Sequence, residues 1–278
     1  MNYNPINLPL KSIFSIILLI FTSHCLLAGW VITEERTDYY GNKAVQTTFI
    51  QDNLIRHETQ KSIAIIDLDK KLITIVFSQY KLYWKGTTQE LKESTLDAYE
   101  SQMERLRVGL NESARIEFDS IFNNLKNQLL DTTSRFPDLS VEVLQTEEEE
   151  EIMGYRCRKY NVLIDSVLTE SIWHTNEIKP YNDINLKNMI SFMNQLTPNS
   201  GKGSLNQTNE YLDLMKSGVM LKSIEYAGND TAYEVKVTKL REIGIIRDFF
   251  EPPPSYRAAS FTDILNLMPV RKTDYDEW

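Results

Sequence analysis

The sequence predicts an α+β protein built around an antiparallel β-sheet, and three features support this prediction. Residues 151–175 show a long β-hairpin pattern with the turn formers Asp165 and Ser166 between its two runs. Residues 30–84 contain short strand-like runs separated by polar turns, which is typical of an antiparallel meander. Apolar residues at helical spacing replace this pattern in residues 88–130 and again near 186–193.

Residues 1–28 are expected to be a secretory signal peptide. Lys11 supplies the positive flank, residues 12–27 (SIFSIILLIFTSHCLL) form the apolar core, and cleavage is expected after Ala28. An uncleaved anchor is the alternative, but the run is short for a membrane span of about 20 residues. Cys25 makes a poor lipidation site because His24 precedes it. We therefore expect a periplasmic or secreted protein whose mature chain has no transmembrane span.

Composition limits the function classes. The chain has 278 residues, of which 42% are hydrophobic and 25% charged, as in a folded soluble protein. Its formal net charge is -9, and an acidic chain lacks the basic face that sequence-independent nucleic-acid binding needs. Residues 29–278 are expected to form one half-barrel domain with a helical insert at 88–130. Cleavage would leave Cys157 as the only cysteine, so we expect no intramolecular disulfide.

The first strand of the central hairpin changes the face on which its apolar residues lie. Tyr155 and Cys157 share one face, whereas the apolar residues of 160–164 share the other. A β-bulge near Arg158 and Lys159 would explain the change. The alternative is a strand covered partly on both faces. Trp173 on the return strand is expected to pack in the core.

Helical segments are expected on both sides of the central hairpin in sequence. Thr87 and Glu90 fit a capping box, and Gly109 is placed to end the helix that follows. A second helix up to residue 130 should complete a pair that lies across the sheet. A later helix carries its apolar residues on one face: Leu186, Met189, Ile190 and Met193.

Residues 147–151 are five consecutive glutamates. A calcium site needs oxygen ligands that converge from a bent loop containing glycine, and this run lacks that spacing. We therefore interpret the run as a solvated turn that leads into the central hairpin.

The sequence contains no recognisable catalytic or metal-binding pattern. Beyond residue 28 the histidines are His57 and His174, and neither belongs to an HExxH or CxxC motif. Lys202 between two glycines does not fit a phosphate-binding loop, and no GxSxG elbow occurs. A nucleophile pair of Cys157 and His174 is conceivable, but a thiol between apolar strand neighbours tends to be buried and inert. We expect a non-enzyme without metal or cofactor.

Two stretches resemble known families. SIAIIDLDKKLITIVF (62–77) resembles the strand–turn–strand unit of bacterial outer-membrane lipoprotein carriers. IMGYRCRKY (152–160), followed by SIWHT, resembles an uncharacterised secreted bacterial domain family with a Gly-Tyr-x-Cys strand, and residues 252–256 are in keeping with it. The matching residues are Gly154, Tyr155, Cys157, Lys159, Tyr160 and Trp173. The resemblance implies a curved antiparallel half-barrel with helices covering its concave face, without catalytic residues. The insert at 88–130 departs from the family pattern.

The leading functional hypothesis is a periplasmic or secreted non-catalytic protein that binds an apolar or acyl ligand. The alternative is a structural or protein-interaction domain of the cell envelope, whose half-barrel is filled by its own helices. Methionine suits the lining of a ligand pocket because its flexible thioether adapts to varied shapes. The residues expected to line the pocket are Tyr83, Tyr155, Trp173, Met189 and Met193.

Overall fold

The computed structural model describes residues 27–130, 140–196, 208–228 and 230–267. The expected signal peptide up to residue 26, the loop 199–207 and the last eight residues lie outside the described residues. No helix in the described ranges is long and apolar enough to cross a membrane.

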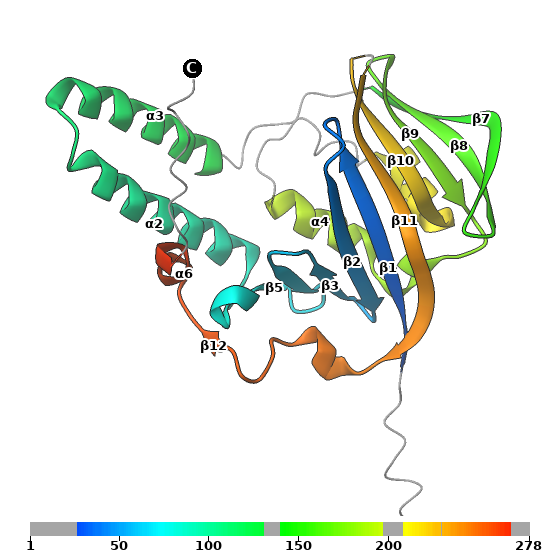
Figure 1. Cartoon of the computed structure of the whole chain (residues 1–278), viewed down its shortest axis with the longest axis horizontal. Helices are drawn as coiled ribbons and strands as arrows, with labels where there is room; N and C mark the ends of the chain where they lie inside the picture. Colours follow the sequence, from blue (N-terminus) through cyan, green and yellow to red (C-terminus); the bar gives the residue numbers. More distant parts are fainter. Residues whose placement is uncertain (1–26, 131–139, 197–207, 229, 268–278) are drawn as a thin grey trace, which may run out of the picture.

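The described strands form one curved sheet that does not close into a barrel (Figure 1). Its order is β12-β6-β5-β4-β3-β2-β1-β11-β10-β9-β8-β7, and only β12 pairs in parallel, with β6. The strands are β1 (Leu27–Asp38), β2 (Lys43–Gln51), β3 (Leu54–Glu58), β4 (Ile63–Asp67), β5 (Leu72–Phe77), β6 (Leu82–Gly86), β7 (Val141–Ile152), β8 (Tyr155–Ile164), β9 (Val167–Thr175), β10 (Val219–Ala227), β11 (Asp230–Ile245) and β12 (Arg257–Ala258). The predicted α+β class with an antiparallel half-barrel is confirmed.

The helices are α2 (Thr88–Arg107), α3 (Glu112–Leu130), α4 (Leu186–Leu196), α5 (Asn209–Ser217) and α6 (Phe261–Leu267). The capping box at the start of α2 is confirmed in both directions. The Thr87 backbone N–H donates to Glu90 Oε2 at 2.6 Å, and the Glu90 backbone N–H donates to Thr87 Oγ1 at 3.2 Å. These bonds satisfy two backbone N–H groups that the first turn of a helix otherwise leaves without partners.

The tight reversal between β8 and β9 is also confirmed. Asp165 and Ser166 both have positive φ, 49° and 66°, as a two-residue type I′ turn requires. A second such reversal joins β7 to β8 through Met153 and Gly154, with φ of 56° and 83°.

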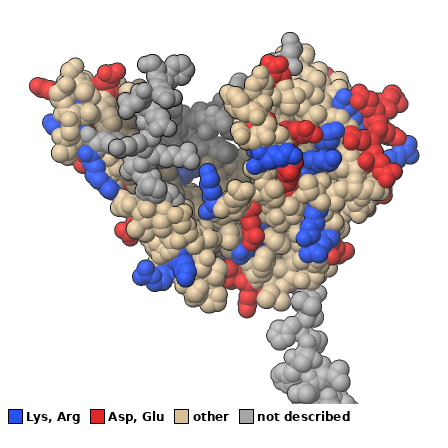
Figure 2. Space-filling model, viewed as in Figure 1, with Lys and Arg blue, Asp and Glu red and all other residues tan. Residues whose placement is uncertain are grey.

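The interpretation of residues 147–151 as a turn is wrong, because these glutamates continue strand β7 at the edge of the sheet. Figure 2 shows the acidic side chains gathered over this edge. Cations on β8 and β10 compensate the charge: Glu148 pairs with Lys159 at 3.0 Å, Glu149 with Arg158 at 2.9 Å and Glu150 with Lys222 at 3.1 Å. Cross-strand pairs of opposite charge stabilise a sheet, and charged edge strands resist unwanted pairing.

The irregularity predicted near Lys159 exists, but its extra residues lie on the partner strand. Gln145 pairs with Tyr160 and Glu149 with Arg158, so residues 146–148 of β7 face a single residue of β8. Against β9, by contrast, β8 stays in regular register through Arg158 and Lys159, and its shift comes later, at Val162 and Leu163. The sequence of one strand therefore located the bulge without showing which strand carries it.

Helices pack against one side of the sheet and share the main hydrophobic core with it (Figure 1). α4 contributes Leu186 and Phe192 to this core, and α6 contributes Ile264. Phe192 is only 4% exposed, whereas its neighbour Met193 is 43% exposed. Met193 is therefore largely exposed, although Leu186 and Ile190 of the same predicted face are buried. Its role in lining a pocket stays a prediction.

The pair α2–α3 does not lie across the sheet as expected. Figure 1 shows this hairpin pointing away from the sheet, with α2 packing on α4 and α6. Farther out, Val108, Ile116 and Ile121 are all exposed. An apolar stripe predicts that a helix has a buried face, but it does not say what will cover that face.

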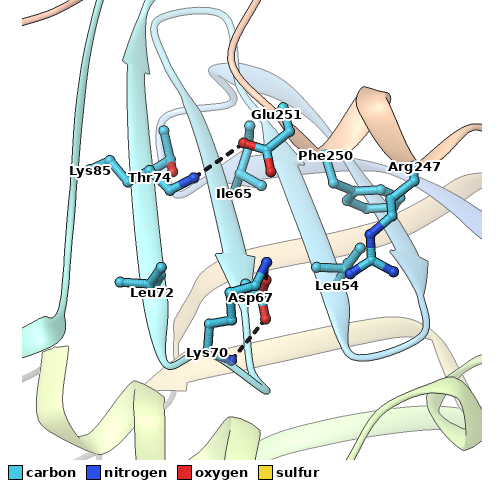
Figure 3. A pocket seen from close by; sticks show the side chains of 10 residues that line it. All are labelled: Leu54, Ile65, Asp67, Lys70, Leu72, Thr74, Lys85, Arg247, Phe250 and Glu251. Atoms are coloured by element: carbon cyan, nitrogen blue, oxygen red, sulfur yellow. Dashed lines mark hydrogen bonds and ion pairs between the residues drawn. The ribbon is translucent and has the colours of Figure 1, made fainter.

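The opposite face of strands β2–β6 carries a second hydrophobic cluster under residues 246–256. Arg56 holds this segment from below: its Nη1 donates to the Phe249 carbonyl at 2.8 Å, and its guanidinium lies 4.4 Å from the centre of the Phe249 ring. Figure 3 shows Phe250, Arg247 and Glu251 of the segment facing the strands, with Glu251 paired to Lys85 at 3.2 Å. The cavity beneath has about 20 Å³, room for roughly one water molecule.

Candidate functional site

The five residues expected to line a pocket are not brought together. Tyr83 packs in the second cluster under residues 246–256, because successive strand residues point to opposite faces and Trp84 takes the side of the main core. Trp173 is buried in the main core, and the ammonium of Lys222 lies 4.3 Å from its ring centre. Met189 is half-buried against the same core. Their role in ligand binding stays a prediction.

Tyr155 lies in the floor of an open groove of about 580 Å³. We name this the Tyr155 groove. Its floor also contains Trp30, Ile178 and Leu240, and all four side chains are half-buried against the main core. Three parts of the chain meet here: the start of the central hairpin, strands β1 and β11 in the middle of the sheet, and the residues that follow β9. No sequence pattern indicated Trp30, Ile178 or Leu240, since they come from segments far apart in the chain.

Charged side chains surround this floor. Glu177, Asp183 and Glu242 supply carboxylates, and Lys179 and Arg241 supply cations. Burial raises the pKa of Asp183, and the nearby carboxylates of Asp52 and Glu242 raise it further. The lining of the groove thus contains three carboxylates against two cations.

A second pocket has a volume of about 390 Å³ and shares Glu177 with the Tyr155 groove. Glu149 binds both guanidinium groups there, with Arg158 Nη2 at 2.9 Å and Arg156 Nε at 2.6 Å. These two arginines lower the pKa of Glu149, Arg158 having the larger effect. One carboxylate thus binds two guanidinium groups through charge-assisted hydrogen bonds.

His174 forms the inner wall of this second pocket and is 5% exposed. Nε2 is buried without a hydrogen-bond partner among the described residues, and such burial disfavours a charged ring. The backbone of Leu214 has a smaller, opposing effect on the pKa. Burial accordingly lowers the pKa of His174 to about 4.

This environment predicts an acid-sensitive contribution to stability. The folded pKa of His174 lies below its unfolded value near 6.5, so unfolding takes up a proton at pH values between the two. The stabilisation is present above about pH 6.5 and is lost as the pH falls through 4. A His174→Phe variant, measured by urea unfolding, should lose about 2 kcal/mol less than the wild type between pH 7 and pH 4. Equal losses in both proteins would contradict this prediction.

The structure does not bring Cys157 and His174 together as a nucleophile pair. His174 lies opposite Arg158 in the ladder, and adjacent strand residues point to opposite faces, so Cys157 faces the other way. Cys157 is fully buried, and burial raises its pKa to about 11. A neutral thiol and a neutral imidazole on opposite faces do not form the thiolate–imidazolium pair that such catalysis uses.

Cys157 is therefore expected to be inert in the folded protein. A thiol reagent at pH 8 should not label the native protein and should label it fully in denaturant, because only the unfolded chain exposes the thiol. Cys157→Ser should cost about 1–3 kcal/mol, because a hydroxyl is costlier to bury than a thiol and the Tyr155 carbonyl that accepts from Sγ lies 3.6 Å away, and Cys157→Ala should cost less. Rapid labelling of the native protein, followed by mass spectrometry, would show instead that the strand opens.

The fold is thus that of an open antiparallel half-barrel whose inner side is packed with helices. No family model matches the chain, and no curated protein matches it. Among solved structures, the chain is similar to an uncharacterised conserved protein from Thermus thermophilus, with a TM-score of 0.40, 7% identity, and coverage of 88% of this chain and 98% of that one.

The MucA/MucB complex of Pseudomonas aeruginosa gives a TM-score of 0.36 at 8% identity, covering 84% of this chain and 58% of the other. An outer membrane lipoprotein-sorting protein domain from Vibrio parahaemolyticus gives a TM-score of 0.26 at 7% identity, and the match covers 82% of this chain and 91% of the other. The chain also matches PNGF-II, of which it spans only 32%. All these similarities are distant.

Proposed function

We propose that this chain is a non-catalytic protein-interaction domain of the cell envelope, periplasmic or secreted, whose half-barrel is filled by its own helices. One observation carries the proposal. Phe192, Leu186 and Ile264 come from helices and are buried in the same cluster as sheet residues such as Trp84 and Leu221. Side chains of the protein itself thus occupy the space that an acyl chain would need.

The α2–α3 hairpin supports an interaction role. Ile116 is 69% exposed and Ile121 63% exposed, although both belong to a helix long enough to bury a stripe. Exposed apolar side chains grouped on one projecting element are typical of surfaces that contact another protein. The partner we propose is a protein of the same envelope compartment.

A ligand-binding experiment separates this proposal from the apolar-ligand hypothesis. The purified protein is titrated into a fluorescent fatty acid, and we expect no saturable signal because the inner side of the sheet is filled. Saturable binding at micromolar concentration, weakened by Met189→Asp without loss of fold, would favour the acyl-ligand hypothesis and overturn our proposal.

A crosslinking experiment tests the proposed surface directly. A photo-reactive amino acid at Ile116 or Ile121 should give one defined protein adduct in intact cells. The same group at Val167, which is similarly exposed but begins β9 on the sheet, is the matched control and should give none. Identical patterns at all three positions would contradict a specific contact through the hairpin.

A further inference from the structure

The Tyr155 groove combines two features that point to one class of ligand. Its floor carries two aromatic side chains, Trp30 and Tyr155, which the apolar side chains Ile178 and Leu240 extend. Aromatic rings attract cations to their faces, and half-buried apolar side chains cover the aliphatic part of a ligand. Both properties are supplied by rigid elements, since Trp30 belongs to β1 and Tyr155 begins β8.

Carboxylates surround the floor of the groove, and their negative charge is complementary to a cationic ligand. Glu242 lies directly opposite Trp30 in the β1–β11 ladder, and Asp183 and Glu177 line the groove beside them. Asp52 adds a further carboxylate close enough to act on Asp183. No ion pair within 4 Å joins these four carboxylates to Lys179 or Arg241 among the described residues. A cationic ligand would supply these carboxylates with a counter-charge that Lys179 and Arg241 do not provide by direct pairing.

We infer that the Tyr155 groove binds an extended peptide segment of a partner protein that places a lysine or arginine side chain beside an apolar one. The aliphatic stem and the apolar neighbour lie on Trp30 and Tyr155, and the cationic head lies among Asp183, Glu177 and Glu242. This inference rests on the proposed interaction function and names the chemistry of the partner. A metal ion is a poorer occupant, because no cluster in the described part of the chain has the ligand set to hold one.

Two short peptides test the inference. They carry the same neutral dye and differ only in a central residue flanked by leucines, which is lysine in one and glutamate in the other. Fluorescence anisotropy with the purified protein should show the lysine peptide binding at least about tenfold tighter, and added salt should reduce the difference. Equal affinities, or tighter binding of the glutamate peptide, would overturn the inference.

Matched substitutions locate the contact. Asp183→Asn should weaken binding of the lysine peptide about fivefold. Asp230→Asn removes the same charge about 35 Å away along β11 and should leave binding unchanged. Exposed Glu177→Gln serves as a second variant if Asp183→Asn affects folding. Equal effects of Asp183→Asn and Asp230→Asn would place the binding elsewhere and overturn the assignment.

The fluorescent fatty acid is included in the same series so that the two proposals can fail separately. Saturable fatty-acid binding would remove the proposed interaction function and, with it, the basis of the groove assignment. If neither the fatty acid nor the lysine peptide binds, the groove assignment alone is overturned, and the crosslinking at Ile116 and Ile121 still decides the interaction function.

Discussion

Replacing Gly218 by alanine is expected to destabilise the protein by at least about 3 kcal/mol. A Cβ atom at this position would lie 1.9 Å from the Thr175 carbonyl oxygen, 2.7 Å from His174 Cε1 and 2.8 Å from Asn176 Cα. Two of these contacts are with backbone, which cannot rotate away, so β9 and β10 would have to separate. Overpacking of this kind costs 1–3 kcal/mol in tolerant sites and more where backbone must move.

Gly154→Ala is the matched control for this prediction. Gly154 has a φ of 83°, so alanine there is strained, but nothing lies within 4 Å of its Cβ position. The expected cost is about 1–2 kcal/mol for the left-handed backbone alone. Urea unfolding of both variants measures the difference, and equal costs would show that β9 and β10 are less tightly packed at Gly218 than the structure implies.

Phe192→Ala is expected to cost about 3–5 kcal/mol, the range for an aromatic side chain removed from a packed core. Phe192 is 4% exposed and belongs to the core cluster that joins α4 to the sheet. The cavity left behind would also lie on the inner side of the half-barrel, where the acyl-ligand hypothesis places its ligand. We therefore expect the variant to bind apolar dyes that the wild type does not bind.

Exposed Ser191 on the same helix provides the control. Ser191→Ala should change stability by no more than about 0.5 kcal/mol, because it alters no buried contact. Thermal or urea unfolding of the two variants gives the comparison. A loss below about 1 kcal/mol for Phe192→Ala would mean that α4 is not firmly packed, and would reopen the inner side of the sheet as a ligand site.

Local patterns predicted the local structure well. The capping box of Thr87 and Glu90 and the turn at Asp165 and Ser166 rest on interactions between residues close in sequence, so the sequence contains all the partners. The acidic run at 147–151 was interpreted wrongly for the opposite reason. Its charges are compensated by Arg158, Lys159 and Lys222 on β8 and β10, and a run of five glutamates does not show which cations the pairing of strands will supply.

The candidate site was predicted only through Tyr155. The other residues of its floor come from β1, β11 and the segment after β9, and they share no spacing or motif in the sequence. Tyr83 illustrates the same limit. The strand that contains Tyr83 was predicted. Only the tertiary structure shows that residues 246–256 cover the face of the sheet on which Tyr83 lies.

The sequence by itself determined the α+β class, most strands and helices and the burial of Cys157, because hydrophobic periodicity acts within a single strand or helix. Only the tertiary structure decided which helices fill the half-barrel, that α2–α3 projects from it, and where Trp30 meets Tyr155. Those outcomes depend on how the curvature of the sheet brings distant segments together, and that curvature is a property of the assembled ladder of strands rather than of any one of them.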